Sequence, residues 1–188
     1  MTILPHRLRR VAAIALATVG IATAAVAGPT ASVKLDRFHI NLMQRYDDVR
    51  HLSTDDLARM NPDDVVLFDV RDPAEYDVSR IDGAVRVPPS IDAAAFLDAH
   101  AGALRGKTVV FYCSVGERSS RLAQRVAARA PDTGPIYNLA GGLFRWHNEN
   151  KPVVAERGET TAIHPFNRKW GRLIERQDAI RMEPESDS

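Results

Sequence analysis

The single cysteine of this chain stands before a short segment that could activate a thiol. Cys113 ends the apolar run 108–113, and a helix is expected to begin about six residues later. Between them, Gly116 can adopt a positive φ and Arg118 supplies a positive charge. Backbone N–H groups of such a loop, with the N-terminus of the next helix, can surround an anion. These features favour the thiolate, the nucleophilic form of cysteine.

Having only one cysteine restricts the chemistry that Cys113 can perform. A disulfide within the chain is impossible, so any covalent chemistry involves a small molecule or another chain. A thiol-redox function would need an intermolecular disulfide because the chain has no resolving cysteine. The alternative without chemistry is a buried, inert thiol at the end of a strand. The position of Cys113 before a glycine-containing loop favours a reactive thiol.

The elements that position Cys113 follow from the pattern of apolar residues. Strands are expected at 65–70, 84–87, 108–113 and 136–139. Helices are expected at 53–60, 91–104 and 119–130, and in a segment containing Leu143 and Trp146. This alternation predicts an α/β fold with a mostly parallel sheet covered by helices on both faces. Ligands bind at the carboxyl ends of such strands, where Cys113 lies.

The N-terminus has the composition of a secretory signal peptide. Residues 1–10 include three arginines and no acidic residue, and residues 11–27 are apolar. The run ends in a small-x-small triplet, which predicts cleavage after Ala27 and export to the periplasm or the exterior. The alternative is an uncleaved membrane anchor over 11–27, although a spanning helix prefers about 20 strongly apolar residues.

The remaining chain divides into four expected parts. Residues 28–49 form an N-terminal extension with some helix, and residues 50–154 form the folded domain. Residues 155–182 are expected to form a helical C-terminal extension that packs on the domain, with Pro165 able to begin a helix. A partner-binding role is the alternative for this extension. The acidic tail 183–188 is expected to be disordered.

Four motifs in this chain resemble, in order and spacing, those of the rhodanese-like domain family, the thiosulfate and 3-mercaptopyruvate sulfurtransferases. Residues 113–119 are similar to its Cys-x-x-Gly-x-Arg-Ser loop. Residues 68–76, 81–88 and 138–142 resemble its other motifs. The resemblance covers about residues 50–154. It implies a five-stranded, mostly parallel sheet flanked by helices, and transfer of sulfur through a persulfide on Cys113.

The resemblance also implies roles for individual residues. Cys113 would carry the sulfur. The substrate- and anion-binding cradle would be Ser114, Val115, Gly116, Glu117, Arg118 and Ser119. Arg118 would contact an oxyanionic donor such as thiosulfate, and Asp69 and Arg71 would support the site structurally. The implied partners are a small-molecule sulfur donor and a thiophilic acceptor, with no cofactor beyond the persulfide itself.

Glu117 departs from what an anion-binding loop would be expected to contain. A carboxylate that points into the loop would repel thiosulfate. It could instead pair with Arg118 or Arg121, which lie one and four residues later. The identity of the donor therefore depends on the direction of this side chain.

Other classes of function fit the sequence less well. A phosphatase or arsenate reductase of related fold needs an arginine six residues after the cysteine, where this chain has Ser119. A binding or scaffold module with little turnover is the main alternative. The net charge of +1 gives no reason to expect a nucleic-acid partner, and the six histidines lack metal-ligand spacing. Membrane contact is expected only through the N-terminal segment, if it is uncleaved.

Overall fold

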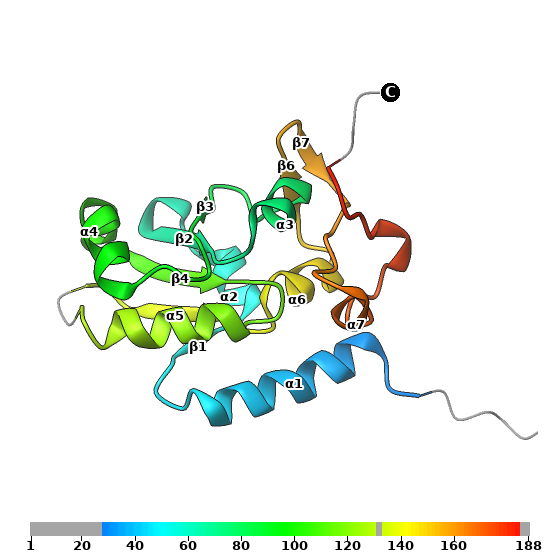
Figure 1. Cartoon of the computed structure of the whole chain (residues 1–188), viewed down its shortest axis with the longest axis horizontal. Coiled ribbons are helices and arrows are strands. Elements are labelled where there is room, and N and C mark those ends of the chain that lie inside the picture. Colours follow the sequence, from blue (N-terminus) through cyan, green and yellow to red (C-terminus); the bar gives the residue numbers. More distant parts are fainter. Residues whose placement is uncertain (1–27, 131–132, 185–188) are drawn as a thin grey trace, which may run out of the picture.

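The computed structural model describes residues 28–130 and 133–184. The predicted signal segment 1–27 and most of the predicted tail 183–188 lie outside this part of the chain. Five parallel strands form the central sheet in the order β1-β5-β4-β2-β3 (Figure 1). Their bounds are β1 (His51–Leu52), β2 (Val65–Asp69), β3 (Val85–Arg86), β4 (Thr108–Tyr112) and β5 (Ile136–Leu139). The predicted α/β fold with five parallel strands is confirmed.

Helices cover both faces of this sheet. They are α1 (Ala31–Arg45), α2 (Thr54–Arg59), α3 (Pro73–Val78), α4 (Ala93–Leu104), α5 (Glu117–Ala127), α6 (Gly142–Asn148) and α7 (Arg168–Gly171). Two 3₁₀ turns complete the set, η1 (Pro62–Asp64) and η2 (Gln177–Ala179). No helix in the described ranges is long and apolar enough to cross a membrane.

Strand β4 separates two apolar cores because successive side chains of a strand point to opposite faces. Val110 and Tyr112 belong to the core that contains residues of α2 and α6. Val109, Phe111 and Cys113 belong to the core that contains residues of α4 and α5. Helix α1 runs along the molecule beside α5 and contributes to both cores (Figure 1).

The register of the central strands brings two chain segments to the same edge. Strands β2 and β4 pair over their full length, and Asp69 is level with Tyr112. Arg71 and Cys113 therefore follow at the carboxyl edge of adjacent parallel strands. This is the edge at which ligands bind in open α/β sheets.

Helix α5 begins at Glu117, two residues earlier than predicted. Gly116 precedes it with φ 100°, a left-handed conformation that glycine adopts readily. The carboxylate of Glu117 is favourable in the first turn because it faces the positive end of the helix dipole. As a result, Glu117 and Arg118 lie in the first turn of a helix and not in a loop.

The prediction of a helical C-terminal extension is wrong for most of its length. Strands β6 (Val153–Ala155) and β7 (Gly158–Thr160) form an antiparallel hairpin instead. The following chain includes α7, which spans only four residues. Positive φ angles at Gly158 and Phe166 prevent a continuous helix. The apolar side chains Ile163 and Ile174 are nevertheless buried in the domain core, so the extension packs on the domain as expected.

Candidate active site

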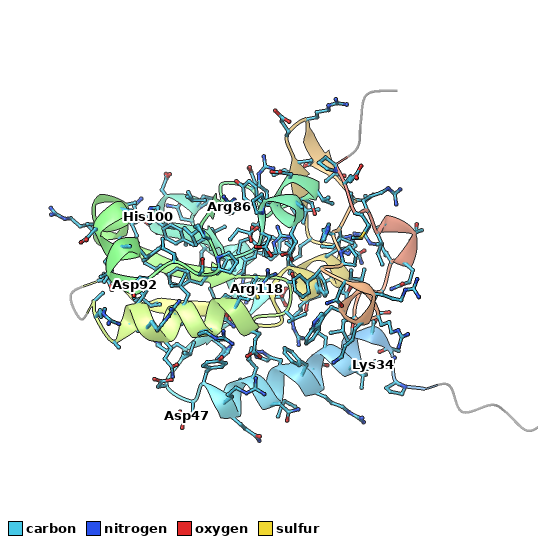
Figure 2. The ribbon with its side chains drawn as sticks, in the orientation of Figure 1. Lys34, Asp47, Arg86, Asp92, His100 and Arg118 are labelled. Carbon is cyan, nitrogen blue, oxygen red and sulfur yellow. The ribbon has the colours of Figure 1, made fainter. Side chains whose placement is uncertain are left out.

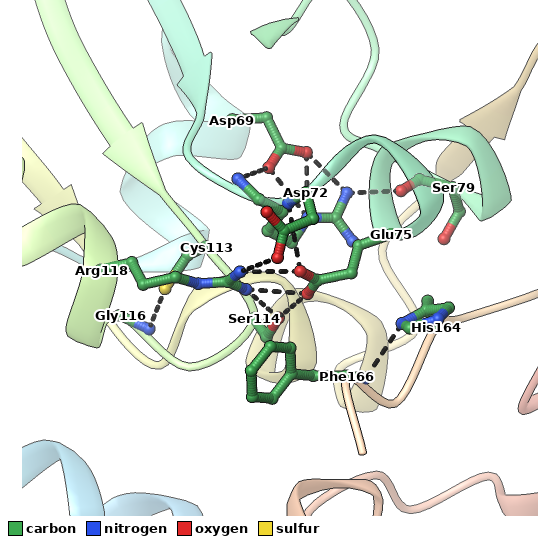
Figure 3. Close-up of polar contacts among 11 residues, drawn as sticks. Asp69, Asp72, Glu75, Ser79, Cys113, Ser114, Gly116, Arg118, His164 and Phe166 are labelled. Carbon is green, nitrogen blue, oxygen red and sulfur yellow. Dashed lines mark hydrogen bonds and ion pairs between the residues drawn. The ribbon is translucent and has the colours of Figure 1, made fainter. Parts of the chain in front are cut away.

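Cys113 lies directly after β4 and is almost completely buried, with 1% of its surface exposed. The backbone N–H of Gly116 donates a hydrogen bond to Cys113 Sγ over 3.2 Å (Figure 3). The positive φ of Gly116 turns this part of the chain back toward the sulfur. A backbone donor aimed at sulfur stabilises a thiolate more than a thiol because it interacts with the negative charge.

The N-terminus of α6 binds the opposite side of the same loop. Leu143 N–H donates to the carbonyl of Cys113 over 2.8 Å, and Phe144 N–H donates to that of Ser114 over 2.9 Å. Gly142 allows this close approach, because a Cβ atom there would lie 2.3 Å from the Cys113 carbonyl oxygen. The carbonyl groups of Cys113 and Ser114 are therefore hydrogen-bonded to α6 and not directed at the sulfur.

Arg118 extends across the site from α5 to the N-terminal end of α3. Its Nη1 and Nη2 atoms donate to the carboxylate of Glu75 over 2.7 and 2.8 Å (Figure 3). Nη2 also donates to Ser114 Oγ over 3.0 Å, and Nη1 donates to Asp72 over 3.3 Å. Arg118 lies near the middle of the molecule in Figure 2, whereas Lys34 and Asp47 lie at its edge. The expected anion contact is therefore already engaged by two carboxylates.

The charge balance of this cluster favours ionised groups. Burial raises the pKa of Glu75, but the hydrogen bonds and charge of Arg118 outweigh burial and lower it. Burial also lowers the pKa of Arg118, and Glu75 together with the nearby Cys113 raises it by more. Ser114 Oγ donates a further hydrogen bond to Glu75 over 2.6 Å. Arg118 is consequently a fixed cation within electrostatic reach of the thiol.

Glu117 points away from the sulfur, toward α1. Its two carboxylate oxygens each accept a hydrogen bond from Arg45 Nη1 over 3.0 Å, and Tyr46 donates to one of them over 3.2 Å. Arg121 is 3.8 Å from the same carboxylate, whereas Arg118 is bound to Glu75. The carboxylate thus pairs with one of the two arginines that the sequence suggested, and with Arg45, which it did not.

Asp69 and Arg71 form a fully buried ion pair beneath the site. Arg71 Nη2 lies 2.6 Å from Asp69 Oδ2 and also donates to the carbonyl of Ser79 over 2.6 Å. Arg71 thereby ties the end of β2 to the residue that follows α3. The supporting role expected of Asp69 and Arg71 stays a prediction.

Two hydroxyl groups in α5 have no hydrogen-bond partner among the residues that the structure describes. They belong to Ser119 and Ser120, both of which are fully buried. Val115, another residue of the expected cradle, is also buried. The hydroxyl of Ser119 is therefore still able to donate a hydrogen bond.

Comparison with known proteins identifies the family. A model described as a rhodanese-like domain matches residues 53–149, just over half of the chain. The chain belongs to this family. Its rhodanese-like domain has the fold of the thiosulfate sulfurtransferase from Pseudomonas aeruginosa, with a TM-score of 0.51 at 19% identity, over 75% of this chain and 27% of that one.

Curated relatives share parts of this domain. A sulfurtransferase of Allochromatium vinosum is 28% identical over 112 residues, which is 58% of this chain and 99% of that protein. A tRNA uridine(34) hydroxylase of Bordetella petrii is 34% identical over 87 residues, 45% of this chain. The match covers only 34% of that hydroxylase and 21% of a probable adenylyltransferase/sulfurtransferase of Mycobacterium tuberculosis.

Both extensions outside the matched residues reach the candidate site of the rhodanese-like domain. On the N-terminal side, Leu42 of α1 packs so closely on Gly116 that a Cβ atom there would lie 3.0 Å from it. On the C-terminal side, the ring of Phe166 lies over the guanidinium of Arg118, 4.8 Å from its central carbon. The site thus includes residues from segments that the family match does not cover.

Glu75 and Phe166 contact Arg118 but were not among the predicted site residues. A usable signal existed for Glu75, because the segment Asp72-Pro-Ala-Glu75 has the spacing of a capping box. In the structure, Asp72 N–H indeed donates to Glu75 over 3.2 Å. No comparable local signal marks Phe166, which is 48 positions beyond Arg118, the residue that it contacts.

Proposed function

We propose that this protein is a sulfurtransferase that moves a sulfane sulfur from a donor such as thiosulfate to a thiophilic acceptor. The carrier is a persulfide on Cys113. The observation that carries the proposal is the hydrogen bond from Gly116 N–H to Cys113 Sγ, within a loop in which α6 binds the carbonyl groups of Cys113 and Ser114. The relatives named as sulfurtransferases support the same chemistry.

The two half-reactions balance without a cofactor. The thiolate of Cys113 attacks the outer sulfur of thiosulfate, the S–S bond of thiosulfate breaks, and sulfite leaves with the bonding electron pair. The product is the persulfide anion Cys–S–S⁻. An acceptor such as cyanide then attacks the terminal sulfur, forms thiocyanate and returns the thiolate.

The size of the loop supports sulfur over phosphate as the transferred group. Only three residues, Ser114 to Gly116, separate Cys113 from the first residue of α5. Arg118 follows the cysteine by five positions, one fewer than the phosphatase pattern requires. A cradle of this size fits a single sulfur atom better than a phosphoryl group with three equatorial oxygens.

Arg118 can offer one N–H group to an anionic donor. Its Nη1 atom is 3.3 Å from Asp72, the longest of its four hydrogen bonds, and the Asp72 side chain is 56% exposed. Exchanging this contact for an oxygen of thiosulfate costs little, because exposed ion pairs contribute little to stability. Glu75 keeps the guanidinium in place during the exchange.

Turnover of thiosulfate and cyanide tests the proposal against a binding or scaffold module. We expect multiple thiocyanate molecules per protein molecule, and none from a Cys113→Ser variant that folds normally. A wild-type protein that binds donor but makes no thiocyanate with any of several sulfane donors would support the scaffold alternative.

We also propose that the protein is exported, on the basis of residues 1–27. N-terminal sequencing of protein secreted by cells is expected to begin at Gly28. Material that retains Met1 and sediments with membranes would instead indicate an uncleaved anchor.

A further inference from the structure

Phe166 occupies an unusual backbone conformation in the C-terminal extension. Its φ angle is 62°, in the left-handed region that bulky side chains rarely adopt, and 41% of its surface is exposed. Its N–H donates to His164 Nδ1 over 3.0 Å, and the N–H of Asn167 donates to the carbonyl of Pro165 over 2.7 Å. A strained, exposed aromatic residue needs contacts elsewhere that compensate for its position.

The extension holds Phe166 on a rigid base. Ile163 is fully buried, donates to the carbonyl of Ala179 over 3.0 Å and accepts from Arg181 N–H over 3.1 Å. His164 is 6% exposed, and burial lowers its pKa, which favours the neutral ring whose Nδ1 accepts the bond from Phe166. The direction of the Phe166 ring is thus set by residues anchored in the domain core.

The ring of Phe166 gives the guanidinium of Arg118 a contact beyond its hydrogen bonds. The edge of the guanidinium is bound by Glu75, Ser114 and Asp72. Its central carbon lies over the Phe166 ring, 4.8 Å from the ring centroid (Figure 3). Stacking on an aromatic face attracts a cation and removes water from that face. The four hydrogen bonds and the contact with the ring together leave the guanidinium little freedom to move.

We propose that Phe166 is a positioning residue that holds the guanidinium of Arg118 beside Cys113 and so sets the preference of the site for anionic reagents. It acts through Arg118 and not on the sulfur directly. A less hydrated, less mobile cation attracts an incoming anion more strongly than one exposed to water. The inference rests on Cys113 being the nucleophile of the proposed reaction, but it can be tested without sulfur transfer.

The test compares alkylation of Cys113 by iodoacetate and by iodoacetamide. In both reagents the thiolate attacks carbon and iodide leaves, and the reagents differ in charge, so the ratio of their rates reports the electrostatic field at Cys113. We expect Phe166→Ala and Phe166→Leu to lower the iodoacetate-to-iodoacetamide ratio about threefold to tenfold. Phe166→Tyr, which keeps an aromatic face, should retain the wild-type ratio. Met182→Ala, an exposed apolar residue of the same extension, is the control and should change nothing.

A double-mutant cycle separates action through Arg118 from a general structural role. In an Arg118→Ala background, Phe166→Ala should have no further effect on the ratio. An unchanged ratio in Phe166→Ala, a wild-type ratio in Phe166→Leu, or an equal fall in the Arg118→Ala background would overturn the proposal. If the ratios behave as expected but the wild-type protein transfers no sulfur, the proposed function fails while the positioning role stands.

Discussion

Arg118 and Glu75 form a bidentate ion pair. Nη1 and Nη2 of the arginine lie 2.7 and 2.8 Å from Oε2 and Oε1 of the carboxylate, respectively. The Glu75 side chain is 2% exposed and that of Arg118 is 20% exposed. The pair joins the first turn of α5 to α3, so Arg118 is held by an element from another part of the chain. This contact makes the position of Arg118 a property of the fold and not of the loop alone.

Replacing Glu75 with glutamine should destabilise the protein by about 2–3 kcal/mol at neutral pH, because Arg118 would lose its buried counter-charge. The pKa of Glu75 is lowered in the folded state, so the wild-type ion pair stabilises the fold above pH 4.5 and this contribution is lost as the pH falls further. The difference between variant and wild type should therefore shrink below that pH. Urea unfolding of both proteins across this range measures it.

Asp72→Asn provides the matched control for this loss. Asp72 is more exposed and lies farther from Arg118, at 3.3 Å, so its removal should cost less than about 1 kcal/mol. If the two variants lose equal amounts of free energy of unfolding, burial of Glu75 does not explain how much the ion pair stabilises the fold.

Glu117→Gln should leave the use of thiosulfate within about twofold of wild type, because the carboxylate faces Arg45 and Tyr46 and not the sulfur. The free energy of unfolding should fall by less than about 1 kcal/mol, since the Arg45 side chain is 61% exposed. Steady-state kinetics with varied thiosulfate checks the first expectation. A large improvement in the Michaelis constant would mean that Glu117 acts on the donor after all.

Gly142→Ala should lower the free energy of unfolding by about 2–4 kcal/mol, because the new Cβ atom would overlap the carbonyl of Cys113. Gly83→Ala is the control. Gly83 also has a positive φ, 72°, but nothing lies within 4 Å of its Cβ position, so it should cost only about 1 kcal/mol. Urea unfolding measures both, and similar losses would argue against the close contact of α6 with the loop.

Ser119→Ala should slow the loading of sulfur about tenfold if the Ser119 hydroxyl donates to the anionic donor or the persulfide. Ser120→Ala should stay within about twofold of wild type, because Ser120 lies beyond the predicted cradle. Both hydroxyls are buried without a partner among the described residues, so the two variants are matched in burial and chemistry. Stopped-flow release of sulfite measures loading, and equal rates for the two variants would remove Ser119 from the site.

The sheet was predictable because its strands carry strong local signals. The runs 65–70 and 108–113 are almost entirely apolar, as is typical of strands buried on both faces, and they became β2 and β4. Strand β1 was missed as a separate element because its two residues give no periodic pattern. The C-terminal extension was wrongly predicted as helical because Pro165 is compatible with the start of a helix, whereas the positive φ angles at Gly158 and Phe166 come from local turns that the apolar pattern does not reveal.

The cysteine loop was predictable from sequence, but the partners of its side chains were not. The order Cys113, Gly116, Arg118 is local, so the turn and the following helix could be inferred. Glu75 and Phe166 contact Arg118 from 43 positions before it and 48 positions after it. Such contacts depend on how the sheet edge, α3 and the C-terminal extension are brought together, which no local pattern encodes.

The mass of the intact protein after one exposure to thiosulfate tests the central claim most directly. We predict a gain of one sulfur atom on the wild-type protein, its removal by cyanide with release of thiocyanate, and no gain on Cys113→Ala. A gain that survives Cys113→Ala, or no gain with any sulfane donor, would contradict the assignment of Cys113 as the sulfur carrier.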